Sequence, residues 1–132
     1  MRCVVDTNVI VSASVFSLSV PRQAVEGVLR EHVLLFSEST MDELKNVLFR
    51  PKFDRYVSRE DRALFLAHLD AAAEFVSIIQ LVRECRDPND DKFLEVVLNG
   101  SADVIITGDE DLQKMHPWRG IAIYSPSQYL RL

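Results

Sequence analysis

The sequence is poor in glycine and proline, with four and five residues among 132. Together they make up about 7% of the chain, against roughly 12% in average proteins. This argues against collagen, mucin-like stalks and disordered chains. Only two cysteines are present, Cys3 and Cys85. Two widely separated cysteines build neither a disulfide framework nor a zinc site, so we expect a globular protein of the reducing cytoplasm.

Long apolar runs are also missing, because no segment approaches the roughly 20 residues that cross a bilayer. The apolar N-terminus is interrupted by Asp6 and Asn8 and has no clear basic region or cleavage site. We therefore expect neither a signal peptide nor a membrane partner. Positive charge is not in excess either, since 15 Lys and Arg oppose 20 Asp and Glu, a net charge of −5. This disfavours a general nucleic-acid coat protein but allows a nuclease with an acidic active site.

Short apolar runs alternate with amphipathic segments along the whole chain, and its length suits one domain, residues 1–132. Strands are predicted at 3–5, 33–36, 75–79, 104–107 and 121–124. Helices are predicted over 21–31, from 39 or 40 to 50, over 58–73, and from 89 or 90 to 100, with a short last helix from Pro126. Strands separated by helices indicate an α/β fold, a three-layer α/β/α sandwich with a mostly parallel sheet of about five strands.

Acidic side chains fall where ligands of such a sheet bind, beyond the carboxyl ends of the strands. Asp6 ends the first strand, and Glu43 lies early in the helix after the second. Asp109 and Asp111 follow the fourth strand. Asp91 lies in the first turn of the helix that leads into the fourth strand, and it joins the others if the chain before it returns to that edge.

Most of these acids also have a purely structural interpretation. Thr40 and Glu43 have the spacing of a capping box, and the acids at 90–91 favour the positive end of a helix dipole. Asp109 has the position of an N-cap for a short following helix. Asp6 is harder to explain in this way, because a carboxylate that ends a buried strand loses hydration unless a cation meets it.

Taken together, these carboxylates predict a metal site. Four or five of them at one edge, with no basic residue placed among them, would repel one another unless a cation or water lies between them. Oxygen ligands without His or Cys select hard cations such as Mg²⁺ or Mn²⁺, which suit phosphate chemistry. A phosphotransferase or phosphatase with Asp6 as nucleophile is an alternative. It is disfavoured because Asn8 replaces the usual second Asp and no lysine is placed nearby.

The chain resembles the PIN-domain family of metal-dependent ribonucleases. It looks most like the branch described as toxin components of prokaryotic toxin–antitoxin systems. Each motif is weak alone, but their order and spacing are specific. The matching segments are VVDTNVIVSA (4–13), SESTMDELKNVLFRPKF (37–53), CRDPNDDKFLEVVLNGSADVIITGDEDL (85–112) and SPSQYL (125–130).

The resemblance implies an α/β/α fold, an Mg²⁺ or Mn²⁺ cofactor, cleavage of RNA, frequent homodimers and an antitoxin partner. It also implies roles for particular residues, with Asp90 as the substitute if Asp91 does not serve. The catalytic acids it indicates are Asp6, Glu43, Asp91 and Asp109, with Asp6, Asp91, Asp109 and Asp111 at the metal, and Asn8 and Thr107 holding acids or water in place. A non-catalytic module that binds RNA or protein on the same fold remains the alternative.

Basic and aromatic residues are interleaved in the segment 50–62, a composition that tracks phosphates and stacks bases. Because this segment follows the helix that carries Glu43, we expect it near the acids. Its acidic residues dilute the charge, however, and its aromatic rings also suit simple packing. The candidates for RNA contact are Arg50, Lys52 and Arg55, beside Arg59, Arg62, Phe53 and Tyr56. An apolar stripe follows, at Leu64, Phe65, Leu69 and Ala72, which is expected in the core or in a dimer or antitoxin surface.

Overall fold

A single parallel sheet of five strands, in the order β3-β2-β1-β4-β5, forms the centre of the computed structural model of residues 1–132. The strands are β1 (Arg2–Val5), β2 (Val33–Phe36), β3 (Glu74–Phe75), β4 (Val104–Ile106) and β5 (Ala122–Tyr124). Because β1 lies between β2 and β4, the residues that follow β1 and β4 become neighbours. The backbone N–H of Asp6 donates to the carbonyl of Ile106 at 2.9 Å.

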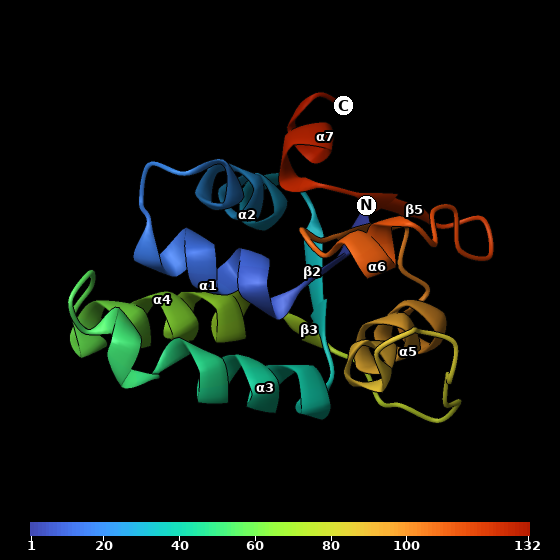
Figure 1. Ribbon diagram of the computed structural model, residues 1–132, viewed down its shortest axis with the longest axis horizontal. Coiled ribbons are helices and arrows are strands. Elements are labelled where there is room, and N and C mark those ends of the chain that lie inside the picture. Colours follow the sequence, from blue (N-terminus) through green and yellow to red (C-terminus); the bar gives the residue numbers. More distant parts are fainter.

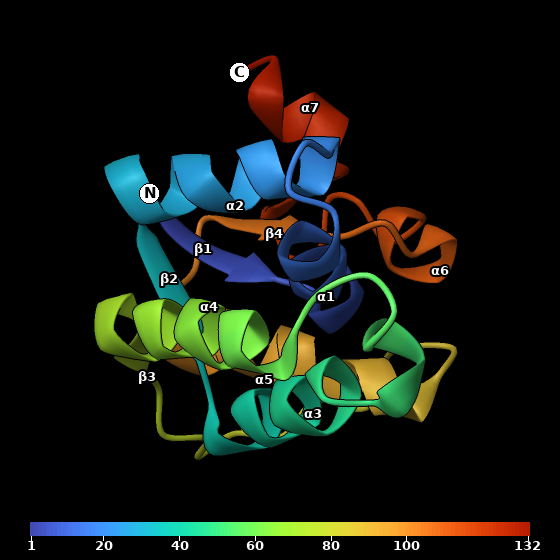
Figure 2. The same cartoon turned by 90° about the vertical axis from the view of Figure 1, so that its left-hand side faces the viewer.

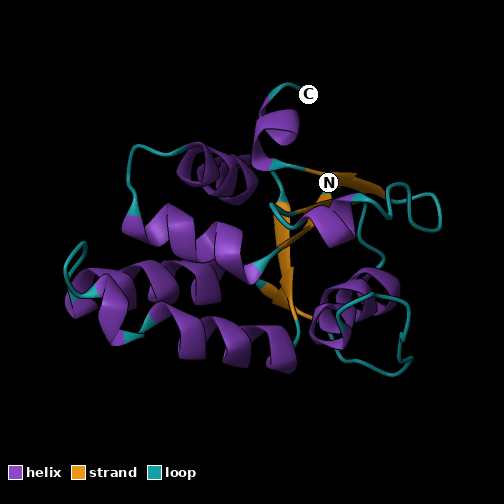
Figure 3. Ribbon diagram, in the orientation of Figure 1, coloured by secondary structure: helices purple, strands orange, loops and turns teal.

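Seven α-helices cover the two faces of this sheet. They are α1 (Thr7–Val15), α2 (Val20–Glu31), α3 (Glu38–Leu48), α4 (Arg59–Ala72), α5 (Asp91–Gly100), α6 (Glu110–Gln113) and α7 (Pro126–Leu130), with 3₁₀ turns at Pro51–Phe53 and Pro88–Asp90. In Figure 1, α1, α2 and α4 lie to the left of the strands and α5 to the right. Figure 2 shows α1, α2 and α4 in front of the sheet, and Figure 3 shows the strands between the helices. The expected three-layer α/β/α fold is confirmed.

Alternation along β1 divides the core between the two faces of the sheet. Cys3 and Val5 point into a cluster with residues of α1, α2, α3, α4 and α7. Val4 points the other way, into a cluster with α5 and with Leu112 of α6. Burying one such side chain fully is worth about 1.5–3 kcal/mol. These two clusters therefore hold the helices in place and fix where the strand ends meet.

Helix α1 is the element that the sequence pattern did not indicate. It begins at Thr7, directly after β1, and Asp6 is its N-cap. The helix packs between its neighbours, so side chains on most of its surface are buried, among them Val9, Ile10 and Val11. A helix that is apolar nearly all round has no polar stripe to reveal a helical period, and its sequence looks like the continuation of the strand.

The third strand, predicted at 75–79, is shorter and begins one residue earlier, because only Glu74 and Phe75 pair with β2. Beyond it, backbone N–H groups bind side chains of α5 instead of a neighbouring strand. The N–H groups of residues 79–80 donate to Asn99 Oδ1 at 3.0 and 2.9 Å, and that of Val82 donates to Glu95 Oε2 at 3.1 Å. The segment is thus tied along α5 rather than added to the sheet.

Two further expectations about the helices need correction. Helix α3 begins at Glu38, with a capping box formed by Ser37 and Thr40 rather than by Thr40 and Glu43. The carboxylate of Glu43 is therefore available for other contacts. In the apolar stripe of α4, Leu69 is fully buried but Leu64 is 63% exposed, so the stripe belongs only partly to the core. None of the helices has both the length and the apolar character needed to span a membrane.

Candidate active site

Asp6 is a buried carboxylate at the carboxyl end of the central strand, with only 5% of its surface exposed. As N-cap of α1 it accepts the N–H of Asn8 at 3.4 Å, and its Oδ2 accepts the Thr107 hydroxyl at 2.7 Å. The same hydroxyl oxygen accepts the backbone N–H of Asp109 at 3.0 Å. Thr107, which follows β4, therefore fixes Asp6 and Asp109 relative to each other.

Like charges crowd around Asp6. Burial, more than any other factor, raises the pKa of Asp6, and the charges of Asp109 and Glu43 add to the rise against its hydrogen bonds. Burial also raises the pKa of Asp90, from its usual 3.8 to about 7, helped by a hydrogen bond with Asp109 and by the charges of Asp109, Asp6 and Asp87. These groups therefore resist ionising together in the absence of a cation.

These acids line one open cleft of about 590 Å³. The acids in its wall are Asp6, Asp87, Asp90 and Asp109, and the other lining residues are Asn8, Val9, Ser12, Val20, Pro21, Gly108, Pro126 and Ser127. No basic side chain is among them. The sequence-based expectation that acids gather beyond the ends of β1 and β4 is met at this cleft by Asp6 and Asp109.

Asp91 lies outside the cleft and binds the chain that precedes α5. Its Oδ1 accepts the N–H groups of Glu84 and Cys85 at 3.0 and 2.8 Å. Burial would raise the pKa of Asp91, but these hydrogen bonds outweigh it and hold the pKa below its usual value. Asp91, Glu95 and Asn99 follow one another at intervals of four residues and lie on the same side of α5. All three accept backbone N–H groups of the segment that precedes the helix. The spacing is visible in the sequence, but the contacts with the preceding chain that separate Asp91 from Asp90, which does line the cleft, are not.

Glu43 and Asp111 also lie outside the cleft lining, and each has a cationic partner. Glu43 Oε1 lies 3.0 Å from Lys92 Nζ, and Asp111 Oδ1 lies 3.7 Å from an Arg86 guanidinium nitrogen. The expectation that no basic residue stands among the acids, and no lysine near them, is therefore wrong for these outer positions. Lys92 was missed because it meets Glu43 only through the packing of α5 against α3, which no local sequence pattern records.

The donor set of the cleft fits a hard divalent cation in its chemistry. Its charged groups are all carboxylates, with no His or Cys, and oxygen ligands of this kind favour Mg²⁺ or Mn²⁺. Burial first, and then the neighbouring acids, raise the pKa of Asp90 to about 7, and a bound cation would favour its charged form. In the structure as it stands, no three His, Cys, Asp or Glu side chains converge on a single metal position.

The basic segment 50–62 lies away from this cleft, contrary to expectation. None of its residues lines the cleft, and the ring of Tyr56 packs 5.7 Å from that of Phe16. Phe16 is the C-cap of α1, whereas Asp6 is its N-cap. The segment therefore lies at the opposite end of α1, on the left in Figure 1.

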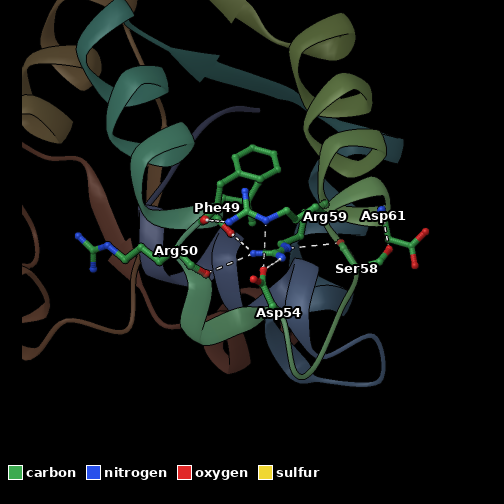
Figure 4. Close-up of polar contacts among 8 residues, drawn as sticks. Phe49, Arg50, Asp54, Ser58, Arg59 and Asp61 are labelled. Carbon is green, nitrogen blue, oxygen red and sulfur yellow. Dashed lines mark hydrogen bonds and ion pairs between the residues drawn. The ribbon is translucent and has the colours of Figure 1, made fainter.

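Within that segment, Arg50, Lys52 and Arg55 are exposed, but Arg62 is fully buried. The Arg62 guanidinium donates to the carbonyls of three residues and forms an ion pair with Asp54. Figure 4 draws this turn and labels the partners Arg50, Asp54 and Ser58. Those carbonyls belong to Leu48, Arg50 and Ser58. Arg62 thus closes the turn between α3 and α4 and is no candidate for RNA contact, although the sequence pattern grouped it with the exposed basic residues.

Comparisons with known proteins agree with this fold. The family model for the PIN domain matches residues 2–111. The uncharacterized protein MJ1680 of Methanocaldococcus jannaschii is 28% identical over 134 residues, which cover all of this chain and 81% of that protein.

Two solved structures share the fold at low sequence identity. PAE2754 from Pyrobaculum aerophilum is similar with a TM-score of 0.68 and 15% identity, over 99% of this chain and 88% of that one. VapBC2 from Rickettsia felis, solved bound to a DNA fragment from its promoter, gives a TM-score of 0.60 and 12% identity over 93% of this chain and 97% of that one.

Proposed function

We propose that this chain, which belongs to the PIN domain family, is a cytoplasmic, metal-dependent endoribonuclease that cleaves RNA phosphodiester bonds. PIN domains are generally nucleases, and PIN nucleases typically use divalent metals. The observation that carries the proposal is the cleft in which Asp6, Asp90 and Asp109 gather without a basic side chain. A protein gains nothing in stability from such a cluster, so its acids are explained better by a bound cation than by folding.

In this proposal Asp6, Asp90 and Asp109 hold Mg²⁺ or Mn²⁺. When bound, the cation neutralises charge on the phosphodiester and lowers the pKa of a nearby water. Asp91 and Asp111, which the resemblance also assigned to the metal, take supporting roles. Asp91 holds the segment before α5, and Asp111 donates its N–H to Asp109 at 3.3 Å.

The surrounding residues orient the reacting groups. The Thr107 hydroxyl donates to one oxygen of Asp6 and the N–H of Asn8 donates to the other, so the orientation of this carboxylate is fixed. Glu43 accepts the hydroxyl of Thr7, the residue after Asp6, and orients the attacking water. Asn8 lies in the wall of the cleft. Attack in line on phosphorus breaks the bond to the 3′ oxygen and leaves a 5′-phosphate and a 3′-hydroxyl.

The test is cleavage of a labelled RNA with Mn²⁺ and with EDTA, for the parent and for Asp6→Asn. We expect Mn²⁺-dependent cleavage by the parent and loss of at least about 100-fold in the variant, with an unchanged fold. Asp70→Asn, an exposed acid on α4, is the matched control and should cleave like the parent. Equal cleavage by Asp6→Asn would remove Asp6 from the mechanism. RNA binding without cleavage by the parent would favour the non-catalytic module.

A toxin role with an antitoxin partner forms the finer part of the proposal. A groove of about 690 Å³ between α2 and α4 is lined in part by Val57, Leu64 and Phe65, and Leu64 is 63% exposed. Exposed apolar surface of this kind suits a protein partner or a second copy. Co-expression with any small neighbouring open reading frame, followed by co-purification, tests the antitoxin. Light scattering of the purified chain tests the homodimer.

A further inference from the structure

Lys92 pairs with Glu43, an acid that lies outside the lining of the cleft. Its Nζ lies 3.0 Å from Glu43 Oε1, and the Thr7 hydroxyl donates to Oε2 of the same carboxylate at 2.5 Å. Both oxygens of Glu43 therefore have a donor, one from α5 and one from α1. Lys92 and Glu43 expose only 21% and 28% of their side chains, so solvent and salt screen this pair less than a surface pair.

These contacts hold Glu43 where its charge is unfavourable. Thr7 directly follows Asp6, and the charge of Glu43 adds to those that crowd Asp6. Like charges repel, so without Lys92 the Glu43 carboxylate would keep one neutral donor and would be driven toward solvent. The ammonium of Lys92 opposes this repulsion from the side of α5, two residues after Asp90.

The other ion pairs of the molecule do not share this arrangement. The comparable outer pair, between Asp111 and Arg86, is longer at 3.7 Å, and its arginine side chain is 83% exposed. Such a pair contributes little to position. Lys92 is therefore the cation whose removal should change the orientation of an acid beside Asp6.

We propose that Lys92 is a positioning residue for RNA cleavage and that it acts through Glu43, whose carboxylate it holds beside Asp6 together with Thr7. This inference rests on the proposed ribonuclease function. It predicts an effect on the rate of the chemical step rather than on cation binding, because Lys92 forms no hydrogen bond or ion pair with the three acids assigned to the cation.

The experiment measures kcat and KM for RNA at saturating Mn²⁺ in a set of variants. Lys92→Met, which keeps the length of the side chain, should lower kcat about tenfold with little change in KM, since a small misplacement near reacting groups has effects of this size. Lys92→Arg keeps a cation for Glu43 and should retain most of the parent kcat. The double variant Lys92→Met with Glu43→Gln should be no slower than Glu43→Gln alone, because Lys92 acts only through that carboxylate.

Two measurements without turnover separate positioning from general damage. The Kd of Mn²⁺, followed by electron paramagnetic resonance, should be unchanged or lower in Lys92→Met, because a positive charge near the acids has been removed. The melting temperature without metal should stay within about 3 °C of the parent. Lys45→Met, an exposed lysine on α3 that forms no ion pair, is the matched control and should leave kcat unchanged.

Three results would overturn the role of Lys92 but leave the proposed ribonuclease function intact. These are a parent-like kcat in Lys92→Met, a loss that Lys92→Arg fails to recover, and a double variant that shows the product of the two single losses. A parent that fails to cleave RNA with Mn²⁺ would instead overturn the proposed function, and this inference with it. The parent reaction therefore tells the two failures apart.

Discussion

The turn around Arg62 and the cleft around Asp6 both bury charge, yet they treat it in opposite ways. Arg62 is fully buried, and its guanidinium meets three carbonyls and the carboxylate of Asp54. Asp6 is nearly as buried, but its neighbours include Asp90 and Asp109, which carry the same charge. The charge of Arg62 meets an opposite charge within the chain, whereas Asp6 has hydrogen bonds from Asn8 and Thr107 but forms no ion pair.

This difference separates a structural use of charge from a functional one. A buried charge with partners on every side fixes local structure, as Arg62 fixes the connection between α3 and α4. A buried carboxylate beside others opposes folding, so its presence calls for a ligand that is absent from the chain. The same comparison explains why the basic residue that resembled an RNA contact is structural, while acids that resembled helix caps form the candidate site.

The largest effect should separate two adjacent acids, Asp90 and Asp91. Asp90→Asn should lower Mn²⁺-dependent cleavage about 100-fold or more, because it removes a carboxylate from the cleft. Asp91→Asn should lower it much less, because an amide oxygen still accepts the N–H groups of Glu84 and Cys85. Initial rates at several Mn²⁺ concentrations measure both variants. The reverse order of losses would return the metal-binding role to Asp91.

At the Arg62 turn the expected effect is on stability. Arg62→Met should lower the free energy of unfolding by about 3 kcal/mol, because it leaves buried carbonyls and Asp54 without their donor. Arg59, which is 57% exposed and 3.5 Å from Asp54, is the control. Arg59→Met should cost less than about 1 kcal/mol. Urea unfolding measures both, and equal losses would show that burial of the guanidinium is unimportant.

The smallest effect concerns how the free energy of unfolding depends on pH, which should differ between the cleft around Asp6 and the turn around Arg62. In EDTA, Asp90 has a folded-state pKa raised from 3.8 to about 7, so the folded protein binds more protons than the unfolded chain in that window. The free energy of unfolding should therefore fall as pH rises from about 4 to 7. Hydrogen bonding to Arg62 lowers the pKa of Asp54, so its contribution is present above the usual pKa and lost in acid below it.

Melting curves of the metal-free parent and of Asp90→Asn between pH 3 and 8 would separate these contributions. In Asp90→Asn, stability should fall less steeply between pH 4 and 7 than in the parent. The variant should also melt at a slightly higher temperature at neutral pH, and it should still lose stability in acid. A decline of equal steepness in the variant would contradict the account of like-charge crowding at Asp90.

Much of the fold was predictable because its strands are short apolar runs that the structure confirms, as at 33–36. Helix α1 was not, because its burial on most sides removes the amphipathic pattern. The end of β3 was also not predictable, because side chains of Glu95 and Asn99, rather than a neighbouring strand, accept the hydrogen bonds of the residues that follow it. Such tertiary contacts leave little trace in local periodicity.

The candidate site was predictable in its location but not in its details. Asp6 and Asp109 follow adjacent parallel strands, so topology alone brings them together. The distinction between Asp90 and Asp91 depends on which side of a helix start faces the cleft, and one residue turns a helix by about 100°. The pairing of Glu43 with Lys92 depends on the packing of α3 against α5, which no sequence motif records.

We propose above that the acids of the cleft bind a divalent cation. Anomalous scattering from a crystal soaked in Mn²⁺ tests this most directly. We expect a strong peak in the cleft, coordinated by carboxylate oxygens of Asp6, Asp90 and Asp109. A soaked crystal with no peak there, or with manganese bound only at Asp91 or Asp111, would contradict it.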